Sequence, residues 1–159
     1  MRTATSLHRT YDADPDSVRA AREATVGFAA AAGFDAARLA DVWLASSEAL
    51  TNVVKHAYEV QGGKIELDVA ITGNELCILI ADEGRGLRPH PSGRGLGLGL
   101  MLIVAVSDEA AIWKRAGGGT AVSMRFGLEG SEPSGGRRQS RGSVCSATAP
   151  ATSRFSTTT

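Results

Sequence analysis

Apolar side chains recur along the first third of the chain at the spacing of amphipathic helices. Asp14-Pro15 reads as an N-cap followed by a proline in the first turn, and it predicts a helix that runs to about Ala32, where Gly33 ends it. Asp35 predicts the cap of a second helix over about residues 36–58. The pattern therefore predicts two consecutive helices.

Farther along the chain the period changes to two, which is typical of strands. Four apolar residues between positions 65 and 71 alternate with smaller or charged ones, and Gly73-Asn74 supplies a turn. We expect further strands at Leu7–Tyr11, Leu76–Ala81, Ala110–Arg115 and Thr120–Phe126, and an apolar, buried helix at Leu98–Val106. This order predicts an α+β fold, a two-layer sandwich in which helices cover one face of a mostly antiparallel, mixed sheet.

The second predicted helix has two faces. At about 100° per residue, its core-facing side collects Leu39, Val42, Trp43, Leu50, Val53 and Ala57. Glu48 and Asn52 point nearly the opposite way, one turn apart, with His56 one turn beyond. An ordinary surface helix also carries polar residues there, so these residues gain meaning only from the segments downstream.

Composition divides the 159 residues into a body and a tail. In residues 130–159, Ser, Thr, Gly and Pro make up 18 of 30 residues, which predicts a disordered tail after a domain at 1–129. The tail carries a net charge of +3 (four Arg, one Glu), so the body carries −3 against a total of zero. A slightly acidic body argues against nucleic acid as the main ligand.

Other bulk features favour a cytoplasmic protein. No apolar run approaches the roughly 20 residues of a membrane span, and no apolar signal segment follows Met1. Of the two cysteines, Cys77 lies in an apolar strand-like run and Cys145 in the polar tail, a pattern that suits a reducing compartment rather than a disulfide framework.

Asp82-Glu83-Gly84-Arg85-Gly86 directly follows a predicted buried strand. The Asp82 carboxylate could accept a hydrogen bond from an exocyclic amine such as that of adenine. Gly84 and Gly86 would let a flat ring approach the backbone. A simple turn at the end of the strand would look similar.

A glycine ladder at Gly93–Gly99 is the candidate phosphate site. Alternating glycines free backbone N–H groups to face an anion, and a helix that starts near Leu98 points its positive end there. The candidate contacts in this ladder are Arg94, Gly95, Gly97, Leu98 and Gly99. A flexible linker is the alternative. P-loop, dinucleotide-binding and eukaryotic-type kinase signatures are missing from the sequence.

With Mg²⁺ on bound phosphates, two helix residues acquire chemical roles. Asn52 offers an uncharged oxygen ligand to the metal, and Glu48 could accept a proton from an attacking hydroxyl or water. Thr120 could bond the base or a bridging water. We leave His56 outside the catalytic set, since a structural histidine near a helix end is the more common case.

These segments together resemble the GHKL ATPase superfamily, and within it the bacterial anti-sigma-factor serine/threonine kinases. Glu48–Asn52 with His56-Ala57-Tyr58 is similar to the N box and Asp82–Gly86 to the G1 box. Gly93–Gly99 running into Leu100–Ile103 is similar to the G2 lid, with one extra Gly-Leu repeat, and Gly119-Thr120 to the last box. The resemblance covers roughly residues 7–128.

The resemblance implies a Bergerat-type ATP site under a mobile lid. It also implies that Glu48 is the general base, Asn52 the Mg²⁺ ligand and Asp82 the adenine contact. Such kinases bind a sigma factor, phosphorylate a serine or threonine of a small antagonist protein, and often act as dimers. Two alternatives stay open, namely a binding module in which ATP only orders the lid, and degenerate nucleotide binding.

Overall fold

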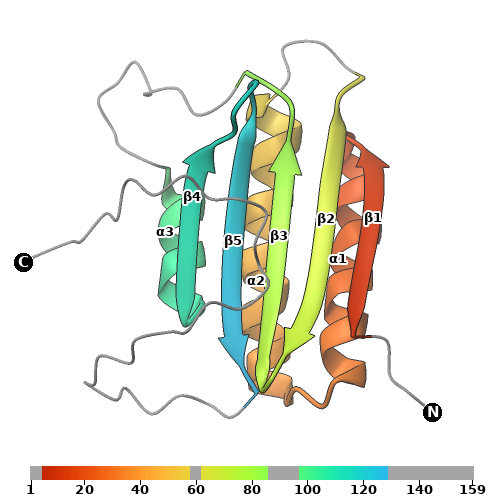
Figure 1. The fold of residues 1–159 in the computed structure, drawn as a ribbon, viewed down its shortest axis with the longest axis vertical. Helices are drawn as coiled ribbons and strands as arrows, with labels where there is room; N and C mark the ends of the chain where they lie inside the picture. Colours follow the sequence, from red (N-terminus) through yellow and green to blue (C-terminus); the bar gives the residue numbers. More distant parts are fainter. Residues whose placement is uncertain (1–4, 58–61, 86–96, 129–159) are drawn as a thin grey trace, which may run out of the picture.

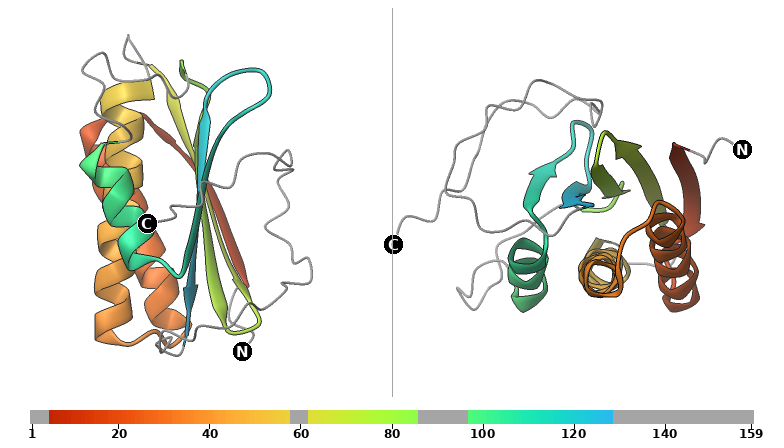
Figure 2. Two further views of the ribbon diagram at one scale, coloured as in Figure 1. Left: turned by 90° about the vertical axis from the view of Figure 1, so that its left-hand side faces the viewer. Right: turned by 90° about the horizontal axis from the view of Figure 1, so that it is seen from below.

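Five strands form one antiparallel sheet, and three helices cover one of its faces in the computed structural model (Figure 1), which describes residues 5–57, 62–85 and 97–128. The helical layer and the sheet are seen edge-on in Figure 2. The elements are β1 (Ser6–Asp12), α1 (Pro15–Ala31), α2 (Ala36–Asn52), a π-helical turn (Val53–Ala57), β2 (Lys64–Thr72), β3 (Glu75–Asp82), α3 (Leu98–Val106), β4 (Glu109–Lys114) and β5 (Thr120–Gly127). The predicted two-layer α+β fold is confirmed, but the sheet predicted to be mixed is antiparallel at every described strand pair.

The strand order β1-β2-β3-β5-β4 places β3 in the centre of the sheet. Ile80 of β3 pairs with Leu67 of β2 and with Val122 of β5, so all three side chains point into the same layer. The resulting core lies between the sheet and the helices, and its largest fully buried members include Leu50, Ile65, Leu76, Ile78, Ile103, Met124 and Phe126. Because β3 is central, Asp82 at its end is held from both sides.

The two long helices begin where the sequence predicts. The Asp14 carboxylate accepts a hydrogen bond from the backbone N–H of Ser17 at 2.7 Å, and the Asp35 carboxylate accepts one from Arg38 N–H at 2.9 Å. The helix predicted over residues 36–58 instead changes at Val53 into a π-helical turn. Residue 58 itself lies outside the described residues.

Two predictions of burial in the helical layer are wrong. Trp43 is 47% exposed and stacks under the Arg22 guanidinium, 4.5 Å from the ring centroid, so it lies at the edge of the apolar face. Helix α3 is also only half covered, because Leu100 and Ile103 are buried but Leu98, Met101 and Val104 are 61–74% exposed. A continuously apolar nonapeptide carries no periodicity from which a buried face could be read.

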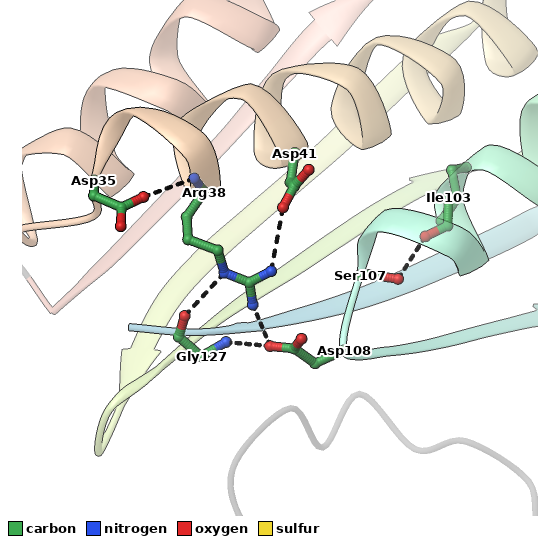
Figure 3. Close-up of polar contacts among 7 residues, drawn as sticks. All are labelled: Asp35, Arg38, Asp41, Ile103, Ser107, Asp108 and Gly127. Carbon is green, nitrogen blue, oxygen red and sulfur yellow. Dashed lines mark hydrogen bonds and ion pairs between the residues drawn. The ribbon is translucent and has the colours of Figure 1, made fainter. Parts of the chain in front are cut away.

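Helix α3 is fixed at its C-terminal end by an ion pair with α2 (Figure 3). The Arg38 guanidinium, only 11% exposed, bonds the Asp108 carboxylate and donates to the Gly127 carbonyl at 3.3 Å. Asp108 in turn accepts from the Gly127 N–H at 2.6 Å, and the Ser107 hydroxyl donates to the Ile103 carbonyl at 2.6 Å. One arginine therefore ties together the start of α2, the connection between α3 and β4, and the end of β5.

Within the described part of the chain, no helix has the combination of length and apolarity that crossing a bilayer requires.

Candidate functional site

Asp82 is the most buried acidic residue at the predicted site. It ends the central strand β3 and is only 4% exposed. Its Oδ1 atom accepts hydrogen bonds from the backbone N–H groups of Gly84 at 2.9 Å and of Thr120 at 3.3 Å. Both of these bonds fall on the same oxygen. Asp82 thus joins the loop that follows β3 to the first residue of β5 through one carboxylate oxygen.

Burial raises the pKa of Asp82 above its ordinary value, because the surrounding protein disfavours the charged form. The two backbone N–H donors and the nearby positive charge of Arg115 act in the opposite direction and lower the pKa. Burial is the largest of these effects. A buried, ionised carboxylate with few hydrogen-bond donors destabilises the folded state. Such groups recur at functional sites.

The π-helical turn connects the end of α2 to the loop that follows Asp82. Arg85 donates its backbone N–H to the Ala57 carbonyl and its Nε to the His56 carbonyl, both at 2.8 Å. A Cβ atom added to Gly84 would lie 2.1 Å from the Ala57 carbonyl oxygen, so no larger residue fits there without a shift. This contact gives Gly84 a packing role, and its predicted role of letting a ring approach the backbone stays a prediction.

The N-terminal end of α3 lies against Glu48 and Asn52. A Cβ atom built on Gly99 would lie 2.5 Å from Glu48 Oε2 and 3.7 Å from Asn52 Nδ2. Gly97 caps the helix without a side-chain hydrogen bond, and its carbonyl accepts from the Leu100 N–H at 3.0 Å, so the N–H groups of Leu98 and Gly99 precede the first bond of α3. In the described part of the chain we find no hydrogen bond or ion pair for either the Glu48 or the Asn52 side chain. Two half-buried polar side chains thus face a helix N-terminus.

The turn between β4 and β5 closes the site on its other side. Gly117, Gly118 and Gly119 all have positive φ angles, and a Cβ atom on Gly119 would lie 1.9 Å from the Asp82 carbonyl oxygen. Arg115 donates from Nη1 to that same carbonyl at 3.0 Å. Sequence reasoning missed Arg115. The signal was its position, the last residue of the predicted strand and two residues before a glycine run that was already assigned to the turn.

The structure brings together most of the predicted site residues that it describes. Glu48, Asn52 and Gly99 meet at one corner, and Asp82, Gly84 and Thr120 meet at another. The contact described for Thr120 runs from its backbone N–H to Asp82, and the predicted bond to the base or a bridging water stays a prediction. Gly97 and Leu98 begin α3, with the Leu98 side chain 74% exposed. Gly86, Arg94 and Gly95 lie outside the described residues.

The donor set suits a nucleotide better than a tightly held metal. In the described ranges, no group of three or more His, Cys, Asp or Glu side chains could hold a metal ion. Mg²⁺ bound with a nucleotide needs only one or two protein ligands, because phosphates and waters complete its octahedron. The Asn52 amide, next to an open helix N-terminus, fits that demand.

Comparison with known proteins identifies a family. Residues 11–126 match the family model described as "Histidine kinase-like ATPase domain". The chain is 39% identical over 67 residues to an anti-sigma F factor of Thermoanaerobacter sp. (strain X514), a match that covers 42% of this chain and 47% of that protein. It is 38% identical over 73 residues to the serine-protein kinase RsbW of Oceanobacillus iheyensis, covering 45% of this chain and 46% of that protein.

A solved structure agrees with these matches. The crystal structure of the RsbU and RsbW domains of Rv1364c from Mycobacterium tuberculosis superimposes with a TM-score of 0.61 at 28% identity, covering 76% of this chain and 32% of that chain. The matches to the curated relatives span about half of their length. Because the family model covers more than half of the sequence, the chain belongs to the histidine kinase-like ATPase domain family.

Proposed function

We propose that this chain is an ATP- and Mg²⁺-dependent serine/threonine protein kinase that binds a sigma factor and phosphorylates an anti-sigma-factor antagonist. The observation that carries the proposal is the corner where the Glu48 carboxylate and the Asn52 amide face the N-terminus of α3. That corner combines a proton acceptor, a neutral metal ligand and an anion-binding helix end. The names of its relatives, anti-sigma F factor and serine-protein kinase, support the same activity.

The adenine end of the proposed nucleotide site is Asp82. Both of its described hydrogen bonds reach Oδ1, which leaves Oδ2 to accept from an exocyclic amine. The adenine amine is such a donor, whereas guanine and hypoxanthine carry a carbonyl oxygen at the equivalent position. A buried carboxylate would therefore favour ATP over nucleotides whose base presents an acceptor there.

The phosphate end lies at α3. The first bond of α3 runs from the Leu100 N–H to the Gly97 carbonyl at 3.0 Å, so the N–H groups of Leu98 and Gly99 precede it, and the helix dipole adds a partial positive charge near them. Asn52 would hold Mg²⁺, which neutralises phosphate charge when it is bound. The predicted contacts from Arg94 and Gly95 belong to the same proposal, although they lie outside the described residues.

Glu48 would act on the acceptor side. At this position its carboxylate can accept the proton from a serine or threonine hydroxyl as the oxygen attacks the terminal phosphorus. Its contact with Gly99 keeps it next to the phosphate end of the site rather than the adenine end. We therefore assign proton acceptance to Glu48 and metal binding to Asn52, one turn away.

A radiolabel experiment distinguishes this proposal from the alternative, in which the chain binds its partner without transferring a phosphoryl group. The purified chain is incubated with [γ-³²P]ATP, Mg²⁺ and a candidate small antagonist-type protein. We expect label on a serine or threonine of that protein. Nucleotide-dependent binding of the same protein without label would show that ATP only organises the site for binding.

A further inference from the structure

We propose that Arg115 is a positioning residue that holds Asp82 in place and thereby sets the preference for adenine. The inference rests on the proposed function, because it takes Asp82 to be the adenine contact. Arg115 does not touch the proposed position of the base itself. It acts through the main chain of the residue that does.

Arg115 links three elements at the end of the sheet. Its Nη1 donates to the Asp82 carbonyl at 3.0 Å, and its Nη2 forms an ion pair with Glu66 of β2 at 3.2 Å. Its backbone N–H donates to the Gly119 carbonyl at 3.0 Å, and Gly118 N–H donates to its carbonyl at 3.2 Å. The guanidinium therefore spans from β2 across the end of β3 to the β4–β5 turn.

The neighbouring backbone leaves little freedom around Asp82. The Gly119 α-carbon is packed so closely on the Asp82 carbonyl that a Cβ atom would be 1.9 Å from its oxygen. Thr120, the next residue, donates its N–H to Asp82 Oδ1. Because Arg115 fixes the turn and the carbonyl together, it also fixes the distance from that N–H to the carboxylate. Losing the guanidinium would let the carboxylate and the turn move apart.

The positive charge of Arg115 supports the same inference. The positive charge of Arg115 opposes the effect of burial on the pKa of Asp82 and so favours the ionised acceptor. Glu66 balances the positive charge of the guanidinium, because its carboxylate lies 3.2 Å from Arg115 Nη2. The side chains of Glu66 and Arg115 are 34% and 29% exposed. The pair places one cation beside the Asp82 main chain without leaving it unbalanced.

A second arginine on the sheet gives a matched control. Arg125 of β5 pairs with Glu75 at 2.6 Å and with Glu109 at 2.8 Å, so it also bridges neighbouring strands. Its side chain is 24% exposed, close to the 29% of Arg115. In the register of the sheet, Arg125 pairs with Cys77, toward the opposite end of β3 from Asp82. Substituting Arg125 by alanine therefore removes comparable ion pairs, but at a distance from the site.

The test compares the dissociation constants of ATP and ITP, which share the ribose and triphosphate but differ in the amine. Each is measured by isothermal titration calorimetry with Mg²⁺ for the parent protein, Arg115→Ala, Arg115→Lys, Glu66→Gln and Arg125→Ala. We expect Arg115→Ala to reduce the ITP-to-ATP ratio of dissociation constants roughly tenfold, Glu66→Gln and Arg115→Lys less, and Arg125→Ala not at all. A merely structural weakening would affect both nucleotides alike and leave the ratio unchanged.

Two results separate the failure of this inference from the failure of the proposed function. If the parent protein binds ATP and ITP equally, the proposed adenine site at Asp82 is wrong. A parent protein that prefers ATP, with an unchanged ratio in Arg115→Ala, would overturn the role of Arg115 alone. If Arg115→Ala does not fold, Arg115→Lys and Glu66→Gln carry the test, and unchanged ratios in both would overturn the inference.

Discussion

Replacing Asp82 by asparagine should weaken ATP binding and at the same time stabilise the folded protein. Asparagine has nearly the same shape, and its carbonyl oxygen can still accept from the N–H groups of Gly84 and Thr120. Its amide nitrogen would then occupy the place of Oδ2 and present a donor to the adenine amine. The substitution therefore exchanges an acceptor for a donor and changes little else.

The loss of affinity follows from one hydrogen bond. A hydrogen bond to a charged group contributes about 1.5–3 kcal/mol, which corresponds to an increase of about 10- to 100-fold in the dissociation constant of ATP. ITP presents a carbonyl oxygen at the same position, so the new amide donor should improve its binding relative to ATP. The change in preference is specific to the edge of the base that Asp82 is proposed to contact.

The gain in stability has a defined pH dependence. Because burial raises the folded-state pKa of Asp82 above 3.8, folding favours its protonated form. This favourable contribution is fully present below the ordinary pKa of 3.8 and is lost as the pH rises through the raised folded-state pKa. At neutral pH the ionised group therefore destabilises the fold, and Asp82→Asn should be more stable than the parent. The difference should shrink as the pH falls toward 3.8.

Two measurements check this prediction. Isothermal titration calorimetry gives the affinities for ATP and ITP, and urea unfolding at a series of pH values gives the stability difference. An Asp82→Asn variant that binds ATP as tightly as the parent would refute the adenine contact. A variant that is less stable than the parent at neutral pH would refute the argument from burial.

Two further predictions test the other parts of the molecule. Gly99→Ala places a methyl group 2.5 Å from the present position of Glu48 Oε2 and should slow phosphoryl transfer about 10- to 100-fold, whereas Gly27→Ala, with open space around its Cβ, should leave the rate of transfer unchanged. Equal rates for both variants would argue against Glu48 as the base. Arg38→Ala should lower the free energy of unfolding by about 2–3 kcal/mol in urea titrations, because the side chain is 11% exposed and its carboxylate partners lose their cation. The exposed pair of Arg19 serves as control and should change stability by no more than about 0.5 kcal/mol on substitution by alanine, and a similar loss in both would contradict the importance of burial.

Most of the fold could be predicted because local signals agreed with the tertiary structure. Asp14 and Asp35 cap their helices as expected, and the alternation at residues 65–71 matches the inward-facing positions of β2. Exposure in the helical layer could not be predicted in the same way. The exposure of Trp43 depends on the position of Arg22, which lies on another helix. The uniformly apolar α3 offers no pattern that separates its buried face from its exposed face.

The residue types of the candidate site were visible in the sequence, but the contacts between segments were not. Nothing in the spacing shows that Gly99 lies against Glu48, since more than forty residues separate them. Gly84 was noticed for its freedom of approach to a ring, whereas the structure shows that the Ala57 carbonyl leaves no space for a side chain. Arg115 was missed because its contact with Asp82 arises only when the β4–β5 turn folds onto β3.

The role proposed for Glu48 is tested by separating nucleotide binding from phosphoryl transfer. ATP affinity and the single-turnover rate of phosphoryl transfer to the antagonist are measured for the parent protein and for Glu48→Gln, which keeps the shape of the side chain but cannot accept the proton. We expect nearly unchanged ATP affinity and a rate of transfer that is about 10²- to 10⁴-fold lower. Transfer at the parental rate by Glu48→Gln would contradict that role.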